Sequence, residues 1–470
     1  MNYNFLIEQL SQFSATLSWD EVPDDVQQAA QRALFDTLSV ITAGGCHPLL
    51  QKIHSGLCRQ SGPAAIVGGR LVTASSAALA NGISAHVHDF DDTNYNGIMH
   101  GSAVIVPAVL AAAAEQNSSW DEVLLALVIG SEVAYTIADH LTHNHYFRGW
   151  YATGTLGLIG AAAAVSRLYE QSVENISVAI SLAAAGAGVS RSIVGTDAKP
   201  FFAGDCARRS IEYAKAASLG LTSPRDVFES PRGFASLLND GILEVENIFP
   251  IGASWRLVDS GLLFKRYPIC SATHTIIDLT AALVKKANCT ENDIKKIHCA
   301  IPQLTAISLV FDHPQTVQEA QFSVLFPVAC AVRYGTLELK HLDHQLISDL
   351  ISNGTPWFFE KTIDPELSSD DMKKQYPECA RITIELKDGR MFSDFCGETH
   401  GMPNRPLSNS DLMAKASQCL SYADILDSKS VELFTTLLNG NLSKDSVSPR
   451  KALTQLWSKA QPRKPGKNQV

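Results

Sequence analysis

The sequence predicts a mainly α-helical protein, in which the N- and C-terminal segments form a large all-helical domain and a smaller α+β domain is inserted between them. Apolar residues recur at helical spacing through most of the first 260 residues, with almost no alternating β-type runs. Alternating runs appear after about residue 265, and helical patterns return from residue 409. We therefore expect one domain to comprise residues 1–264 and 400–470, and the other to comprise residues 265–399.

The helical domain is predicted from a series of amphipathic segments. The clearest begins at residues 23–25, where a proline and two aspartates form a helix start, and ends at the glycine pair 44–45. Runs of Gly and Ala, as at 157–164, let helix axes approach closely because little side chain separates the backbones. We expect the first 260 residues to be an all-helical, closely packed bundle. Its further predicted helices cover residues 75–85, 104–115, 120–140, 155–169, 173–189 and 207–221.

The inserted domain shows strand and helix patterns together. Apolar residues alternate over 297–301, and residues 381–386 and 391–395 flank a Lys-Asp-Gly-Arg turn that predicts a β-hairpin. The polar residues 459–470 are expected to be disordered. Helical spacing predicts further helices, of which the last two are expected to rejoin the first domain, over residues 273–286, 320–332, 410–420 and 429–438.

Charge and composition narrow the classes of function. The 470 residues include 38 Lys plus Arg against 48 Asp plus Glu, a formal charge of −10, which disfavours broad binding to nucleic acid. The most apolar stretches, 103–114 and 176–189, fall short of the roughly 18 residues expected of a membrane-spanning helix. Ten cysteines occur singly without a C-x-x-C pair, and no signal-peptide pattern is found, so we expect a cytoplasmic protein that binds neither membranes nor nucleic acid.

Residues 81–93 form the densest polar cluster, and two interpretations remain open for it. Imidazoles and carboxylates crowded together can bind a divalent cation, as in a metal-dependent hydrolase. A run of aspartates capping a helix, with one or two core histidines, is the alternative that we favour. The side chains concerned are His86, His88, Asp89, Asp91 and Asp92.

Three other segments, 149–154, 197–204 and 265–274, carry reactive groups. A lysine near a helix start usually lies on the protein surface, where water solvates it. Lys199 and Lys265, however, lie among apolar and small residues, where an unpaired ammonium group is costly to bury. Their position favours a functional role for both lysines.

Five motifs occur in order between about residues 5 and 440. They are N-G-x-x-x-H-x-x-D-F-D-D-T from residue 81, H-x-S from residue 100, G-W-x-x-T-G-T-x-G-x-x-x-A-A-A-A from residue 149, A-K-P-x-x-x-G-x-x-A-R from residue 198, and K-x-Y-P-x-C-x-x-T-H from residue 265. Together they closely resemble the MmgE/PrpD family, whose members include 2-methylcitrate dehydratase, cis-aconitate decarboxylase and iminodisuccinate epimerase.

The resemblance implies a large helical domain, a smaller α+β lid domain and a homodimer, with the active site between the two domains and neither a metal nor an organic cofactor. Family members act on small di- or tricarboxylates by proton transfer at a carbon next to a carboxylate. Because such a carbon acid is very weak, the site must supply a positioned base and fixed positive charge. We therefore expect a small anionic di- or tricarboxylate as the substrate.

Matching the motifs position by position implies roles for individual residues. Lys199 and Lys265 are expected to bind carboxylates and stabilise the developing anion. His100 is expected to donate or accept a proton, and Asp89 to orient a neighbour and tune its pKa. A second set is expected to contact the substrate, namely Thr93, Cys270, His274 and Arg266.

Two positions depart from the family pattern. Tyr151 and Cys270 stand where similar cis-aconitate decarboxylases carry histidines, and both side chains normally hold their proton near neutral pH. This difference weakens the case for decarboxylation in particular. We expect a lyase, either a dehydratase or a decarboxylase, with Tyr151 among the catalytic residues. The alternatives are an epimerase that uses Tyr151 and a lysine as two bases, a metal-dependent hydrolase at residues 86–92, and a non-catalytic binding relative.

Overall fold

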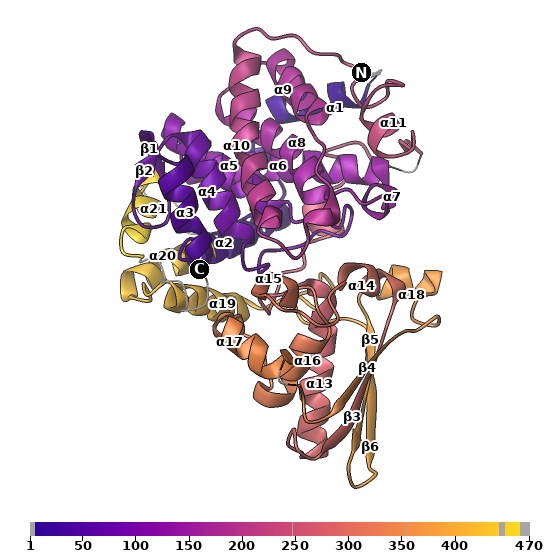
Figure 1. Cartoon of the computed structure of the whole chain (residues 1–470). Helices are drawn as coiled ribbons and strands as arrows, with labels where there is room; N and C mark the ends of the chain where they lie inside the picture. Colours follow the sequence, from indigo (N-terminus) through magenta and orange to yellow (C-terminus); the bar gives the residue numbers. More distant parts are fainter. Residues whose placement is uncertain (1–4, 247, 353, 441–446, 461–470) are drawn as a thin grey trace.

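The computed structural model describes residues 5–246, 248–352, 354–440 and 447–460, and most of them are helical. Two separate hydrophobic cores organise these residues. The larger core draws on positions from Leu6 to Phe264 and again from Leu407 to Ala460, and the smaller one on positions from Tyr267 to Leu386. Figure 1 shows the helices from both ends of the chain together, with the main sheet below them. The C-terminal helices therefore pack with the first core.

The first core is built from helices and one short pair of strands. The predicted helices are present as α2 (Asp24–Gly44), α4 (Ala74–His86), α5 (Ser102–Gln116), α6 (Trp120–Leu141), α8 (Ala152–Leu168), α9 (Val173–Ala185), α10 (Ala198–Ser218), α19 (Asn409–Tyr422) and α20 (Ser428–Leu438). The sequence patterns did not predict α1 (Leu6–Thr16), α3 (Pro48–Leu57), α7 (Asn144–Phe147), α11 (Phe234–Leu238), α12 (Arg256–Asp259) and α21 (Pro449–Trp457).

Three details of this region correct the prediction. An antiparallel pair, β1 (Ser61–Ala65) and β2 (Leu71–Val72), interrupts the region expected to be all-helical. Helix α9 ends at Ala185 rather than at residue 189, because the glycines that follow are poor helix formers. Helix α10 begins at Ala198 rather than at residue 207, since the proline after Lys199 is tolerated in a first turn, where its missing N–H has no partner to lose. Lys199 therefore lies in the first turn of a long helix.

Helix α6 is long and apolar enough, by length and composition, to cross a membrane. The apolar stretches noted in the sequence are shorter and lie elsewhere. In the folded chain, 94% of the apolar window of α6 is buried inside the protein, where α2, α5 and α8 pack against it. Burial in the bundle therefore accounts for the apolar character of this helix.

Two glycines allow α4 and α10 to touch. A Cβ added to Gly82 would lie 2.6 Å from the Cα of Gly204, and one added to Gly204 would lie 2.2 Å from the carbonyl oxygen of Leu79. Only glycine permits this approach at either position. The contact brings the C-terminal end of α4, which carries His86, beside the first turn of α10, which carries Lys199.

The second core lies between a sheet and two helices. Its strands are β3 (Ile294–Ile301), β4 (Phe358–Ile363), β5 (Ala380–Leu386) and β6 (Met391–Cys396), in the order β4-β3-β5-β6. β4 runs parallel to β3, whereas the other neighbouring strands are antiparallel. Helix α13 (His274–Ala287) packs on β5 and β6, and α16 (Leu325–Tyr334) packs on α13. The predicted strand, hairpin and first helix of this region are confirmed.

Other details of the second part differ from the prediction. β4 was not predicted because its side chains are largely exposed and show no apolar alternation. The helix expected over 320–332 is divided into α15 (Val317–Ala320) and α16. The remaining short helices are α14 (Gln303–Ser308), α17 (His344–Ile347) and α18 (Asp370–Gln375).

The polar tail from residue 459, predicted to be disordered, lies mostly outside the described residues. Its first two residues correct that prediction. Lys459 forms an ion pair of 2.6 Å with Asp427, and Ala460 is buried against the first core. The positions after Ala460 are not part of the described chain.

Candidate active site

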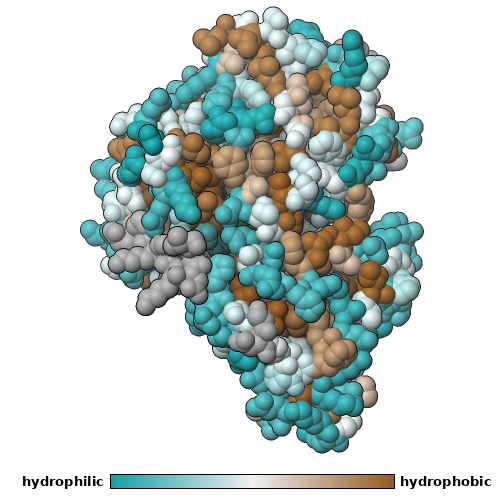
Figure 2. Space-filling view, in the orientation of Figure 1, coloured by the Kyte–Doolittle hydropathy of each residue, from teal (hydrophilic) through white to brown (hydrophobic). Residues whose placement is uncertain are grey.

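A cavity of about 560 Å³ opens where the two cores meet. Figure 2 shows the surface notched on the right, at the level where α7 and α14 face each other in Figure 1. Six of the predicted site residues line the cavity, namely Asp89, Thr93, His100, Tyr151, Lys199 and Cys270. Other lining residues come from the second part of the chain, including Ser308, Phe322 and Glu378. The cavity is therefore formed by segments of both parts.

Asp89 joins the two predicted lysines. The ammonium of Lys199 lies 2.6 Å from Oδ1 of Asp89, and the ammonium of Lys265 lies 2.8 Å from Oδ2 and 2.9 Å from the carbonyl oxygen of the same residue. The side chain of Lys199 is 6% exposed and that of Lys265 is fully buried. Asp89 adopts a left-handed backbone conformation with φ of 49°, which aspartate tolerates better than most residues. One carboxylate thus holds two buried ammonium groups.

This arrangement fixes the charges of the cluster. Burial by itself raises the pKa of Asp89, but Lys199 and Lys265 outweigh it and hold that pKa well below its usual range. Burial lowers the pKa of Lys265, but the carboxylates of Asp89 and Asp91 raise it above its ordinary value. At neutral pH, Asp89 is therefore ionised and Lys265 is protonated.

His86 connects the cluster to Tyr151. Its Nδ1 lies 2.8 Å from Oδ2 of Asp91, while its Nε2 lies 2.6 Å from the Tyr151 hydroxyl and 2.6 Å from the Lys199 ammonium. Burial lowers the pKa of His86 in spite of Asp91, so the ring is neutral. Because ionised Asp91 can only accept a hydrogen bond, we assign the ring proton to Nδ1. Nε2 is then an acceptor for either Tyr151 or Lys199.

His100 is held by the loop that carries the aspartates. Its Nδ1 lies 2.8 Å from the carbonyl oxygen of Asp92 and 3.3 Å from the hydroxyl of Thr93. The carbonyl requires a donor, which assigns the ring proton to Nδ1 and leaves Nε2 unprotonated. Burial lowers the pKa of His100 to about 3. At neutral pH, His100 can therefore accept a proton but has none to donate from Nε2.

Tyr151 and Cys270 both carry protons at neutral pH. Burial, followed by the negative charge of Asp91, raises the pKa of Tyr151 well above its usual value. Burial, followed by the charge of Asp89, raises the pKa of Cys270 to about 12. The phenol is therefore a proton donor, and the thiol is not poised as a nucleophile.

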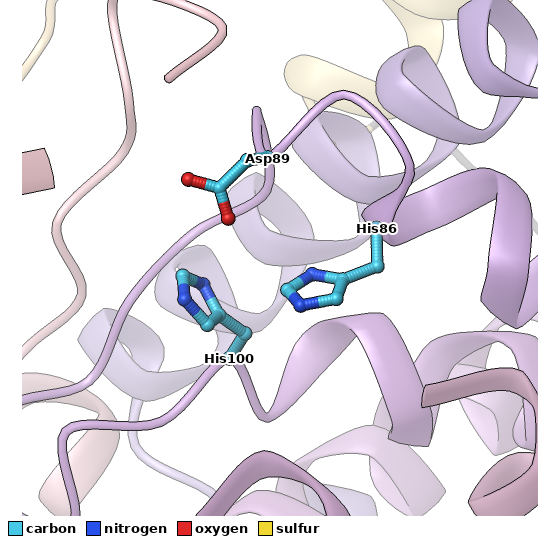
Figure 3. Close-up of side chains that lie close together, drawn as sticks. All are labelled: His86, Asp89 and His100. Atoms are coloured by element: carbon cyan, nitrogen blue, oxygen red, sulfur yellow. The ribbon is translucent and has the colours of Figure 1, made fainter. Parts of the chain in front are cut away.

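A metal site at this cluster requires Lys199 to leave. His86, Asp89 and His100 offer one ligand atom each within 4.8 Å of one another, and Figure 3 shows their side chains gathered together. The Lys199 ammonium, however, lies 2.6 Å from both His86 Nε2 and Asp89 Oδ1, where a cation would sit. The ring of His88 packs elsewhere, 5.5 Å from that of His47 between centroids. The donor set therefore fits a resident ammonium group.

Three predicted site residues do not line the cavity. Lys265 binds the carboxylate of Asp89, which lines the cavity, but it does not line the cavity itself. His274 is fully buried, with its ring 5.1 Å from that of Tyr267. Arg266 is half exposed and lies 3.5 Å from Asp278. Substrate contact, as predicted for Arg266 and His274, has no support from this placement.

Among the lining residues that were not predicted from the sequence, two carry groups that could act on a ligand. Arg191 stands between two serines and resembles an ordinary surface residue in the sequence. Glu378 accepts hydrogen bonds from the Tyr95 hydroxyl at 2.6 Å and from the Ser271 hydroxyl at 2.8 Å, and burial raises its pKa. No sequence pattern marks Glu378. The relevant feature of Arg191, a cavity-lining guanidinium with a buried nitrogen that has no hydrogen-bond partner among the described residues, becomes visible only in the fold.

Comparison with known proteins identifies the family. Models of the MmgE/PrpD N-terminal domain and the MmgE/PrpD C-terminal domain match residues 8–244 and 267–433. The chain is 28% identical to a human cis-aconitate decarboxylase over 397 residues, which cover 77% of this chain and 79% of that protein. It is 25% identical to the mouse cis-aconitate decarboxylase over 418 residues, covering 85% and 83% of the two chains. It is 23% identical over 459 residues to a cis-aconitate decarboxylase-like protein of Aspergillus oryzae, covering 90% and 92%. The chain belongs to the MmgE/PrpD family.

Proposed function

We propose that the protein is a lyase that decarboxylates a small unsaturated tricarboxylate of the cis-aconitate type. The observation that carries this proposal is the ammonium of Lys199, which Asp89 and His86 hold in the wall of a cavity that Tyr151 and His100 also line. A fixed cation stabilises negative charge that develops next to it in a site with little water. The decarboxylase relatives, which the chain matches over most of its length, support the same class of reaction.

The proposed step balances without an external reagent. The bond between the leaving carboxylate and its carbon breaks, carbon dioxide departs, and the electron pair spreads over the double bond onto a neighbouring carboxylate. Lys199 stabilises that anion, and the Tyr151 hydroxyl gives its proton to carbon. The phenolate left behind lies 2.6 Å from His86 Nε2, which lies equally close to the Lys199 ammonium. Once Nε2 has taken a proton from Lys199, it can pass that proton to the phenolate, and a proton from solvent then restores the ammonium.

Dehydration is the second candidate, and the protonation states of two residues favour it. His100 is a neutral base and Tyr151 a neutral acid on the walls of one cavity. His100 would remove a proton from the carbon next to a carboxylate, and Tyr151 would protonate the departing hydroxyl group, so that water leaves. The tyrosine and cysteine at positions 151 and 270, where the resemblance leads one to expect histidines, also distinguish this chain from a typical decarboxylase.

The other candidate activities have weaker support. The relatives found are decarboxylases or decarboxylase-like, and they lend no support to an epimerase. A non-catalytic binding relative would not need a proton donor, a neutral base and a buried cation together. The hydrolase requires a metal ion to displace Lys199.

The domain division and assembly state belong to the same proposal. The two hydrophobic cores support a large helical domain of residues 1–264 and 400–470 and a lid of residues 265–399. Ser308, Phe322 and Glu378 from the proposed lid line the cavity, so closure of the lid would exclude water from it. A homodimer remains a prediction from the family resemblance, and a cytoplasmic location remains a prediction from the sequence pattern. Sedimentation velocity is expected to give twice the mass of the chain.

Product identification tests the proposed function. The purified chain is incubated separately with cis-aconitate, citrate, 2-methylcitrate and iminodisuccinate, and NMR follows each acid and its products. Decarboxylation predicts that cis-aconitate gives a dicarboxylate and carbon dioxide. Dehydration predicts that a hydroxy acid, citrate or 2-methylcitrate, loses water instead. Failure to convert any of the four acids, with binding retained, would overturn both lyase assignments and favour the binding relative.

A further inference from the structure

Arg191 is a cavity-lining cation held next to Tyr151. It begins the 3₁₀ turn Arg191–Ile193, and its backbone N–H donates to the carbonyl oxygen of Gly149 at 2.7 Å. The N–H of Tyr151, two residues after Gly149, donates to the carbonyl oxygen of Val189 at 2.8 Å. These bonds pair the Arg191 segment with the segment that carries the proposed proton donor. The position of Arg191 relative to the reacting end of the cavity is therefore fixed by backbone hydrogen bonds.

The guanidinium of Arg191 is also held in place. Its Cζ lies 4.1 Å from the centre of the Tyr146 ring, and the Tyr146 hydroxyl lies 3.2 Å from that of Ser308 in α14. A guanidinium stacked on a ring loses less freedom when it binds a ligand, because its plane is already set. Tyr146 and Ser308 line the same cavity and belong to its two sides. Arg191 thus lies near the junction of the two parts of the chain.

The guanidinium has unused hydrogen-bonding capacity. Its Nη1 is buried and has no hydrogen-bond partner among the residues that the structure describes. Within those same residues, no carboxylate forms an ion pair with Arg191, whereas Arg148, which also lines the cavity, is paired with Asp240. A buried donor left without an acceptor is costly in a folded chain, and a carboxylate is the acceptor that best matches the fork of a guanidinium. Among the described residues, the Arg191 guanidinium therefore lines the cavity and keeps a donor that a ligand could use.

We infer that Arg191 binds a carboxylate of the substrate remote from the reacting carbon, and that it thereby selects tricarboxylates over acids that lack this group. The inference rests on the proposed function, in which Lys199 serves the carboxylate next to the reacting carbon. Lys199 and Arg191 line the same cavity, so each can bind a different carboxylate of one acid. Arg191 acts in recognition, while Lys199 and Tyr151 act in the chemistry.

Binding of unreactive acids tests the inference without turnover. Isothermal titration measures tricarballylate, a saturated tricarboxylate, and methylsuccinate, which lacks one terminal carboxylate, against the parent chain and its variants. Arg191→Gln is expected to weaken tricarballylate binding by about 10- to 100-fold, the range for a hydrogen bond to a charged group. The same substitution is expected to weaken methylsuccinate binding by less than about threefold. Arg191→Lys keeps the charge but not the fork, and is expected to fall between the parent and Arg191→Gln.

A matched control is Arg209→Gln. Arg209 is also stacked on a tyrosine, 5.4 Å from the ring centre of Tyr213, but it does not line the cavity. Arg209→Gln is expected to bind tricarballylate like the parent. Parent-like binding by folded Arg191→Gln, or an equal loss in Arg209→Gln, would overturn the inference.

Failure of this inference is distinguishable from failure of the proposed function. If cis-aconitate is converted with an unchanged KM by Arg191→Gln, the role of Arg191 is wrong while the lyase assignment stands. If tricarballylate binding depends on Arg191 but no acid of the panel is converted, the carboxylate subsite stands and the lyase assignment is wrong.

Discussion

The hydroxyl of Tyr151 lies 2.6 Å from Nε2 of His86, and both side chains are buried. Because Nδ1 of the same ring faces Asp91, the phenol, imidazole and carboxylate form a continuous hydrogen-bonded row. The histidine that the family resemblance leads one to expect at position 151 is absent, but an imidazole remains one hydrogen bond away. The row couples the proposed proton donor to a group that can accept and return a proton.

Loss of the Tyr151 hydroxyl is expected to reduce turnover far more than stability. Tyr151→Phe keeps the ring and removes the proposed proton donor, so kcat is expected to fall by about 100- to 10,000-fold. Steady-state kinetics and thermal unfolding measure the two effects. Tyr169→Phe is the matched control, because that hydroxyl bonds Glu115 at 2.6 Å outside the cavity. Equal kcat values for the parent and Tyr151→Phe would show that the tyrosine only fills space.

The two lysines on Asp89 are expected to be non-additive in stability. Either Lys199→Met or Lys265→Met leaves the carboxylate with one ammonium partner, whereas the double variant leaves a buried charge with none. We expect the double variant to lose at least about 3–5 kcal/mol of unfolding free energy, and more than the sum of the single losses. Urea unfolding of the parent, the two single variants and the double variant gives the coupling free energy between the two lysines. Strict additivity would contradict the shared-carboxylate arrangement.

Asp92 is expected to make the protein less stable as the pH rises. Burial raises its pKa to about 8 in spite of a hydrogen bond from Ser102, whereas the pKa of an unfolded aspartate is about 3.9. Between these values only the folded chain holds the proton, so unfolding releases it and the free energy of unfolding falls with pH. Relative to Asp92→Asn, which cannot titrate, the parent is expected to lose about 1.4 kcal/mol per pH unit. Urea unfolding of both chains between the two pKa values measures this difference. If the free energies of unfolding of the parent and Asp92→Asn change in parallel with pH, the raised pKa of Asp92 is contradicted.

Metal removal is expected to leave activity unchanged. The Lys199 ammonium lies 2.6 Å from His86 Nε2 and from Asp89 Oδ1, which belong to two of the three residues that could hold an ion. A divalent cation would therefore have to displace the ammonium from its carboxylate. Activity assays after dialysis against EDTA, with and without added zinc or manganese, measure this. A loss on dialysis that added metal restores would revive the hydrolase interpretation.

Helical periodicity predicted most helices of the first core. It missed elements whose residues are exposed or include a proline, because these residues do not follow the apolar period. Helix α10 begins at Ala198 because Pro200 fits a first turn, although a proline in a sequence suggests a helix boundary. β4 carries exposed side chains and pairs with β3 only through the fold. Such tertiary pairings leave no period in the sequence.

From the sequence, only those residues of the candidate site that lie in a recognisable motif could be predicted. The burial cost of an ammonium correctly indicated that Lys199 and Lys265 have partners, but it could not show that they share Asp89. Arg266 and His274 belong to the same motif as Lys265, yet the chain directs them away from the cavity. Arg191 reached the cavity without any such motif, since its role depends on what surrounds it in space.

In the proposed reaction, this cavity transfers a proton to or from carbon with Lys199 as the stabilising cation. Its most direct test is incubation with cis-aconitate in deuterated water, followed by NMR of the recovered acids, for the parent and for Lys199→Met. We expect the parent to give a dicarboxylate that carries deuterium at a single carbon, and folded Lys199→Met to give neither product nor label. Label or product formed equally well by Lys199→Met, or none formed by a parent chain that binds the acid, would contradict it.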